Sequence, residues 1–222
     1  MARLSEQEWD ALYRAFEAPI SAWDCGQYCA PYNDGDPVCC TIQQVIPVLY
    51  HEEFTLLTGR SGLWHEFWPS DAYERRLVDE TGPGQCLAAC SGAQFCEREN
   101  RALSCRAFPF FPYLTRRGEF IGLSYYWEYR DRCWVISNLP VVTDEFRTQC
   151  VAAFESLFAG MPEERETYRQ FSATMRRSYA QRGWTIPLLQ REGGWVMVTP
   201  ADGTLTPWPV EQMPTFAPFD TA

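Results

Sequence analysis

Residues 96–110, CERENRALSCRAFPF, carry two cysteines in a segment without helical or strand periodicity. Residues 24–40, DCGQYCAPYNDGDPVCC, form a second cluster of this kind, dominated by Gly, Pro, Asn and Asp. Irregular backbone lets several thiolates converge on one point and directs amide N–H groups at sulfur. The pattern therefore predicts a cysteine-ligated metal centre, whose expected ligands are Cys25, Cys29, Cys39, Cys40, Cys86, Cys96, Cys105 and Cys133.

The overall composition limits the classes of partner. With 222 residues, 46% of them hydrophobic, the chain is long enough to bury a core without cross-links. Its net charge of −10 repels phosphate backbones and anionic membrane surfaces. Basic residues form only isolated pairs such as Arg116-Arg117, so we expect no nucleic-acid partner.

The number of cysteines asks for a chemical explanation. The N-terminal segment resembles neither a signal nor a transit peptide, and no window approaches 18 apolar residues, so we expect no membrane span and a cytoplasmic location. Thiols stay reduced there, and metal ligation is the usual reason for ten cysteines. Disulfides and inert buried thiols are the alternatives; the second explanation suits Cys150, on the apolar face of an expected helix, and is plausible for Cys90.

The spacing of the cysteines bears on the kind of metal. No CxxC knuckle is present, and the pairs Cys25/Cys29 and Cys86/Cys90 have three residues between their members. Adjacent residues such as Cys39-Cys40 rarely both ligate one metal ion. Either one of them ligates, or a multi-atom centre or two sites are involved. This favours an iron–sulfur cluster, with zinc as the alternative.

One segment resembles a known family. Cys96, Arg101 and Cys105-Arg106-Ala-Phe-Pro fit the pattern C-x4-R-x3-C-R-x-F-P of the zinc- or iron-chelating cysteine-cluster family (YkgJ-type). Ala102 stands where that family usually has Pro, and its compact upstream C-x2-C-G-x-C-C is stretched here. Other matching positions over residues 22–135 are Cys86-Leu87, the Cys39-Cys40 pair, Glu52 or Glu53, and Cys133; Cys25 and Cys29 match loosely.

The resemblance implies a cysteine-ligated iron–sulfur centre, [4Fe-4S] by preference, or zinc. It extends to flagellin lysine N-methylases (FliB-type), through Leu103-Ser104-Cys105, so a protein-modifying enzyme that uses S-adenosylmethionine is the alternative function. No Gly-rich strand–turn–helix that would bind that cofactor is visible. The preferred function is electron transfer, sensing or complex assembly, with a protein partner of unknown identity.

Three further side chains are candidates for a role. Arg106 directly follows Cys105, and its positive charge near an anionic cluster would favour the reduced form, so we assign it to cofactor binding. The alternative is an ordinary ion pair with a surface carboxylate. His51 and His65 are the only histidines; His51 is more simply explained as part of a polar helix start.

The expected fold is α+β, rich in helix and irregular structure. Residues 1–140 would form the cysteine-cluster domain, with an N-terminal helix over 6–17 that Ser5 and Glu8 cap. Residues 141–222 would form a helical hairpin, ended by Gly160 and Gly183, then a β-hairpin around Gly193-Gly194 and an irregular Pro-rich tail, packed on the first domain.

Overall fold

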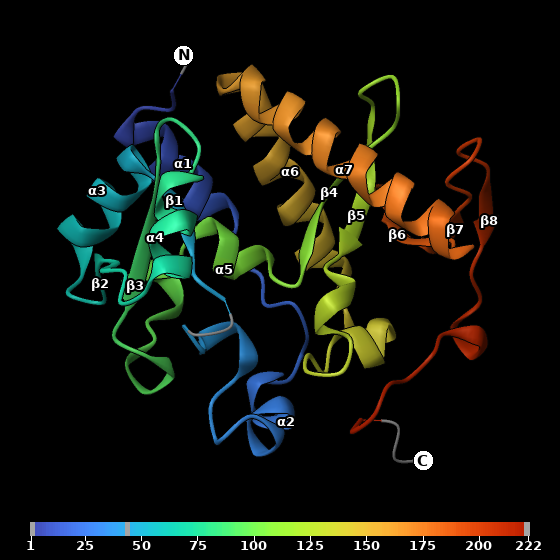
Figure 1. The fold of residues 1–222 in the computed structure, drawn as a ribbon, viewed down its shortest axis with the longest axis horizontal. Helices are drawn as coiled ribbons and strands as arrows, with labels where there is room; N and C mark the ends of the chain where they lie inside the picture. Colours follow the sequence, from blue (N-terminus) through green and yellow to red (C-terminus); the bar gives the residue numbers. More distant parts are fainter. Residues whose placement is uncertain (1–2, 43–44, 220–222) are drawn as a thin grey trace.

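Two antiparallel sheets organise the chain, which the computed structural model describes over residues 3–42 and 45–219 (Figure 1). The smaller sheet has the order β1-β3-β2, with β1 at Val48–Tyr50, β2 at Trp64–Glu66 and β3 at Gln85–Cys90. The larger sheet runs β4 (Phe110–Leu114), β5 (Phe120–Tyr125), β6 (Ile186–Gln190), β7 (Trp195–Val198) and β8 (Leu205–Pro207). The expected mixed α+β class is confirmed.

Long helices and short helical turns occupy different parts of the chain. The α-helices are α1 (Glu6–Ala15), α2 (Gly26–Cys29), α3 (His51–Arg60), α4 (Ala72–Asp79), α5 (Leu103–Ala107), α6 (Asp144–Gly160) and α7 (Pro162–Arg182). The 3-10 turns are η1 (Ala30–Tyr32), η2 (Val38–Cys40), η3 (Ala93–Phe95), η4 (Arg98–Asn100), η5 (Trp127–Tyr129), η6 (Ile136–Val141) and η7 (Val210–Gln212). The expected cysteine-rich loops are thus chains of short turns.

The N-terminal helix forms where its capping signal predicts. The Ser5 side chain accepts from the Glu8 N–H, and the Glu8 carboxylate accepts from the Ser5 N–H, which completes the capping box. Trp9 and Tyr13 are buried on the face that packs against α3. This packing fixes α1 beside the smaller sheet.

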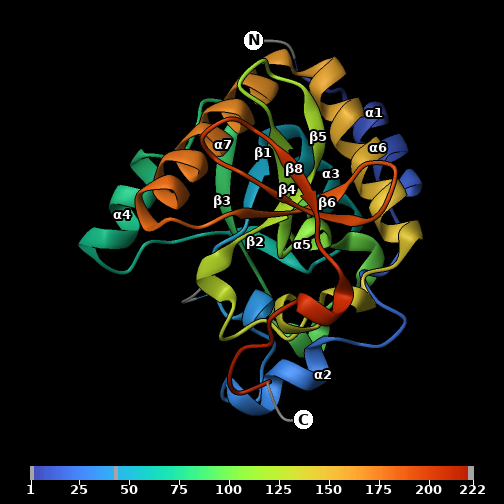
Figure 2. The same ribbon diagram turned by 90° about the vertical axis from the view of Figure 1, so that its right-hand side faces the viewer.

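Strand β4 is buried on both faces because helices cover both sides of the larger sheet (Figure 2). Side chains alternate along a strand, so Phe110 faces α6, with its ring 5.9 Å from that of Phe146. Tyr113, on the opposite face, accepts a hydrogen bond from Arg176 of α7. The sheet therefore lies between α6 and α7.

The C-terminal predictions are confirmed in their regular parts. Thr143 caps α6, and Gly183 ends α7 in the left-handed conformation, with a φ of 69°. Strands β6 and β7 pair as the expected hairpin. The tail is less irregular than predicted, because β8 adds to the edge of β7. The larger sheet combines β4 and β5 from before residue 140 with β6–β8 from after it.

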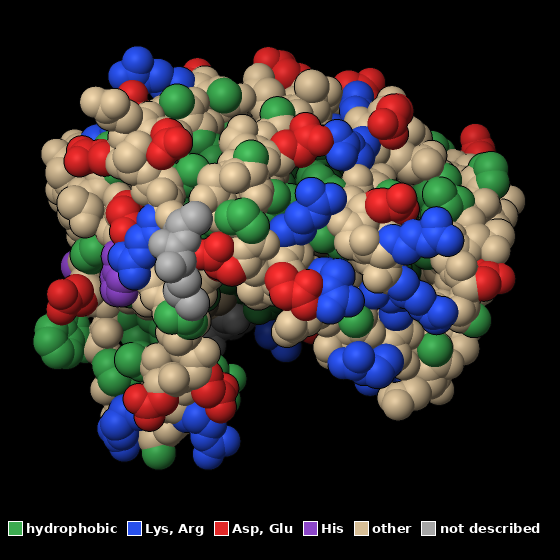
Figure 3. Space-filling view, turned by 90° about the horizontal axis from the view of Figure 1, so that it is seen from above, with side chains coloured by type: hydrophobic (Ala, Val, Ile, Leu, Met, Phe, Trp, Pro, Cys, Tyr) green, Lys and Arg blue, Asp and Glu red, His purple; other side chains and the backbone are tan. Residues whose placement is uncertain are grey.

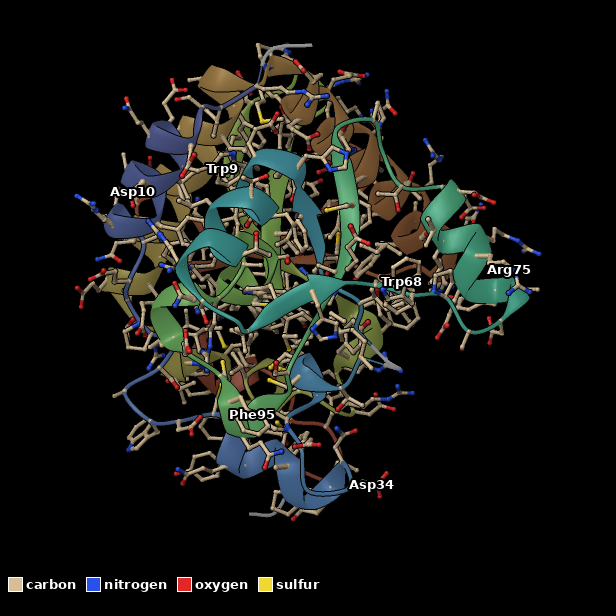
Figure 4. The ribbon with its side chains drawn as sticks, turned by 90° about the vertical axis from the view of Figure 1, so that its left-hand side faces the viewer. Trp9, Asp10, Asp34, Trp68, Arg75 and Phe95 are labelled. Carbon is tan, nitrogen blue, oxygen red and sulfur yellow. The ribbon has the colours of Figure 1, made fainter. Side chains whose placement is uncertain are left out.

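The two cysteine-bearing loop regions lie at the same end of the molecule. Phe95 marks one and Asp34 marks the other, both far from Trp9 of α1 (Figure 4). Across the described ranges, no helix has the length and apolar character needed to cross a membrane. The face seen from above carries acidic and basic side chains next to one another (Figure 3).

Candidate metal centre

The first cysteine pair is held by the short helix α2. Cys25 precedes the helix and Cys29 ends it, so the two thiols stand one helical turn apart. The Asp24 carboxylate accepts from the Gly26 N–H at 3.1 Å and fixes the start of this turn. Burial raises the pKa of Cys25 to about 11, and the charge of the nearby Cys29 adds to this effect.

The adjacent cysteines of η2 bring their sulfur atoms together. The Sγ atoms of Cys39 and Cys40 lie 3.9 Å apart. Two thiolates on one tetrahedral metal would be separated by about 3.8 Å, given metal–sulfur bonds of about 2.3 Å. The turn therefore presents both sulfurs to one region of space, which adjacency in sequence alone argued against.

This pair also has opposite shifts in thiol acidity. The hydrogen bond that Cys39 donates to Cys40 raises the pKa of Cys39 well above its usual range. The same hydrogen bond lowers the pKa of Cys40 to about 7. The Arg101 charge also lowers this pKa, whereas burial raises it. In the metal-free protein, Cys40 is accordingly the thiol that ionises most readily of these two.

A third group of cysteines comes from β3 and the segments that follow it. Cys90, Cys96 and Cys105 border one small hollow together with Cys39 and Cys40. Burial and the charges of Cys40 and Cys90 raise the pKa of Cys105. The structure thus brings Cys90 to the group, although the sequence analysis left it out of the expected ligands as a plausible buried filler.

The remaining cysteines of this region act on one another's pKa. Cys133 lies close enough to Cys25 and Cys29 for their charges, after burial and offsetting backbone hydrogen bonds, to raise its pKa to about 12. Mutual charge effects of the same kind link the other members. These effects relate Cys25, Cys29, Cys39 and Cys133 to one another as one group, and Cys40, Cys90, Cys96 and Cys105 as a second group; the effects of Cys40 on Cys29 and Cys39 connect the two.

Backbone amides support three of these sulfurs, as the irregular sequence predicted. Such hydrogen bonds lower a thiol pKa because they stabilise the thiolate. They involve Val38 at Cys29, Gly92 at Cys90, and Ile136 at Cys133. Burial outweighs them, so all three pKa values are nevertheless raised.

Two cysteines stand apart from both groups. Cys86 is near the other end of β3, four residues before Cys90, and a strand separates such positions by about 13 Å. Burial and the charges of Glu53 and Glu66 raise the pKa of Cys86 to about 11. Cys150 is fully buried in α6, where burial raises its pKa.

The guanidinium that touches the cysteines belongs to Arg101. Its Nε donates to the Cys96 Sγ at 3.0 Å, and its charge reaches Cys40 as well. Sequence reasoning used Arg101 only as part of a spacing pattern. Its place five residues after Cys96, in a segment of short turns, was the available signal.

Arg106 makes a different set of contacts from the one expected. Its guanidinium donates to the backbone carbonyls of Arg101, Tyr13, Phe16 and Glu99. It also lies 4.3 Å from the centre of the Tyr13 ring. These contacts tie the loop after Cys96 to α1, and they give Arg106 neither a sulfur partner nor the surface carboxylate considered for it.

Of the two acidic residues noted after the cysteine pair, Glu53 is the buried one. This side chain is 1% exposed and accepts hydrogen bonds from Tyr13 Oη, the Leu103 N–H and the Tyr50 N–H. It therefore holds the start of α5, which carries Cys105, against α1 and α3. Glu52 is more exposed and pairs with Arg3.

The eight thiols are neighbours without forming a finished ligand set. Within residues 3–42 and 45–219, no three His, Cys, Asp or Glu side chains are arranged to hold a metal ion. All ten cysteines are unpaired in this part of the chain. The two histidines, His51 and His65, are exposed.

A larger cavity borders the same cysteines. Its volume is about 410 Å³, and Cys39 and Cys105 line both this cavity and the small hollow between the thiols. Helices α5 and α7, the segment leading into β1, and the segment from Tyr126 to Tyr129 contribute most of its other walls.

Comparison with known protein families, with curated proteins and with solved structures found no match to this chain. The resemblance to the cysteine-cluster family therefore stays a prediction that rests on the motif residues themselves.

Proposed function

We propose that the chain binds metal through two groups of four thiols, in the form of iron–sulfur clusters, with zinc as the alternative. The observation that carries the proposal is the gathering of eight cysteines from four separate segments at one end of the molecule. Soft thiolate ligands in sets of four suit both iron–sulfur clusters and zinc. The groups meet at the Cys39-Cys40 pair, so each of these adjacent residues can serve a different centre.

The residues present suit such a centre in their chemistry. The sulfurs of Cys39 and Cys40 lie 3.9 Å apart, so the two proposed centres would adjoin at this pair. Arg101 and the backbone amides would offset the negative charge that thiolates and a cluster bring. Binding must draw the thiols closer than they lie in the metal-free chain, which couples metal binding to folding of these loops.

The role that this proposal favours is electron transfer, sensing or assembly of a larger complex with a protein partner. A cluster near the surface, held by loops rather than by a deep core, is suited to exchange electrons or to report a change of state. We place the protein in the cytoplasm, because ten unpaired thiols need a reducing compartment.

Metal analysis of anaerobically purified protein tests the proposal directly. Iron and sulfide should be present, with a broad absorption around ~400 nm from thiolate–iron charge transfer. Colourless protein with stoichiometric zinc would replace the iron–sulfur choice and keep the metal centre. Protein without metal, in which the cysteines are paired as disulfides, would overturn both.

The cavity beside Cys39 and Cys105 supports the alternative function, a protein-modifying enzyme related to lysine N-methylases. A volume of about 410 Å³ lies within the usual range for a bound small molecule. Binding of S-adenosylmethionine, measured by calorimetry, would favour this alternative. A reversible redox step in the visible spectrum, without such binding, would favour the electron-transfer or sensing role.

A further inference from the structure

Aromatic side chains form a large part of the walls of the larger cavity. The Tyr126 ring is central among them, with its centre 5.9 Å from that of Phe171, 6.3 Å from Phe108 and 6.4 Å from Tyr129. Tyr168, which also lines the cavity, lies against Phe154 with their ring centres 5.5 Å apart. Rings in such number offer several faces to a ligand within one cavity.

The charged groups of the lining are all acidic. Glu53, Glu128 and Glu164 are the carboxylates, and the described residues that line the cavity include no Lys, Arg or His. Glu164 is 8% exposed and lies on the same face of α7 as Tyr168 and Phe171, one and two turns further along. The cavity is therefore electronegative both through its carboxylates and through the faces of its rings.

The two inner carboxylates differ in how well the protein satisfies them. Glu53 accepts three hydrogen bonds from the protein and is thereby fixed in place. Glu164 accepts one hydrogen bond from the Tyr50 side chain and a long one, of 3.4 Å, from the Gln85 amide. It has fewer donors than Glu53, and a cation placed beside this buried carboxylate would stabilise its charge.

We propose that this cavity binds an organic ammonium ion, with its charge beside Glu164 and against the rings of Tyr126, Tyr168 and Phe171. Ring faces attract ammonium groups most strongly where water is excluded, and the carboxylate supplies the opposite charge. The chain cannot fill the cavity with a lysine of its own, because its 19 basic residues are all arginine. The inference goes beyond the proposed metal centre and does not require it.

Choline and its uncharged isostere 3,3-dimethyl-1-butanol test the charge requirement on the full-length protein. Line broadening of the ligand methyl resonances gives both affinities, and the metal content of the same preparation is measured alongside. Choline should bind at least about tenfold more tightly than the isostere. Equal affinities, or no binding of either up to about 10 mM, would overturn the proposal.

Two variants and one control assign the site. Glu164→Gln should weaken choline binding by about tenfold and leave the isostere unchanged, because only the charge is removed. Phe171→Leu, at a half-exposed position, should also weaken choline selectively. Glu166→Gln, on the exposed face of α7, is the matched control and should have no effect. Equal effects of Glu164→Gln and Glu166→Gln would refute the assignment, and the Phe171 variant decides if Glu164→Gln does not fold.

Choline selectivity in a preparation without metal would leave this inference standing while the proposed metal centre fails. Protein that contains metal but binds choline and the isostere equally well would overturn this inference and leave the proposed metal centre standing.

Discussion

The larger sheet with α6 and α7 differs from the cysteine-bearing loops in how its structure is stabilised. Helix α6 runs for 17 residues and buries seven of them, whereas α2 runs for four and buries two, and η1 and η3 bury none. The first region is thus stabilised by removing apolar surface from water, as an ordinary core is. The second contains little such surface and much irregular backbone.

This difference indicates that the cysteine-bearing loops are the region that the proposed metal centre would stabilise most. Ordering the backbone costs about 1–2 kcal/mol per residue, and short turns with few buried side chains do not recover that cost from burial. Cross-links between distant loops would recover it. Segments with few buried apolar residues supply most of the eight thiols, so under the proposed function metal binding would add stability there that a hydrophobic core provides elsewhere.

Removing the proposed metal should have the largest effect on stability, and this effect should be confined to the cysteine-bearing loops. Structural metal in small domains contributes on the order of 10 kcal/mol to folding. Chelation, or Cys105→Ser and Cys96→Ser, should abolish metal binding and increase hydrogen exchange in residues 24–40 and 90–105, with α6 and α7 still protected. Exchange that increases equally in α6 would show that the two regions unfold as one. Cys150→Ala, the control, should keep full metal content.

A core substitution should produce the opposite pattern. Phe146 is fully buried, with its ring 5.7 Å from Phe16 and 5.9 Å from Phe110. Phe146→Ala should lower the free energy of unfolding by about 3–5 kcal/mol, from lost burial and the cavity that it leaves. Denaturant unfolding measures this loss, and metal content per folded molecule should stay unchanged. Tyr73→Ala, at an exposed position, should change stability little.

The two arginines near the cysteines sharpen the comparison further. Arg106→Gln should lower the free energy of unfolding by about 2–3 kcal/mol, because backbone carbonyls that accept hydrogen bonds from its guanidinium lose their donor.

Arg101→Gln should instead affect the proposed metal centre. Without the positive charge of Arg101 the more negative reduced cluster is disfavoured, so the reduction potential of iron-loaded protein should fall by on the order of tens of millivolts. A fall in the reduction potential in Arg106→Gln but not in Arg101→Gln would show that Arg106, and not Arg101, acts on the cluster.

The smallest expected effect concerns thiol reactivity in the metal-free protein. Because only the thiolate is nucleophilic, alkylation speeds up as pH rises through a thiol's pKa. Alkylation of Cys40 should have its midpoint near pH 7, and that of Cys25 near pH 11. Mass spectrometry of alkylated peptides gives both profiles. A Cys40 midpoint near the ordinary value would show that the Cys39 hydrogen bond and Arg101 do not stabilise its thiolate.

Local signals were sufficient for the regular elements. Ser5 with Glu8, Thr143, and Gly183 act within a single helical turn, so a short stretch of sequence contains all the interacting groups. The hairpin of β6 and β7 was predictable for the same reason. Strand β8 was missed because its stability comes from pairing with β7 and not from its own Pro-rich sequence.

The sequence predicted which type of residue forms the candidate site, but less well which individual residues belong to it. The sequence by itself determined that many cysteines lie in irregular segments, which pointed to metal chemistry. Only the tertiary structure decided that Cys90 joins the group while Cys86 stands apart, and that Arg101, not Arg106, touches sulfur. The reason is physical: spacing along the chain fixes which side chains can be neighbours within one turn or strand. Contacts between segments such as α2, β3 and α5 depend on how buried groups like Glu53 and Phe110 pack the whole chain.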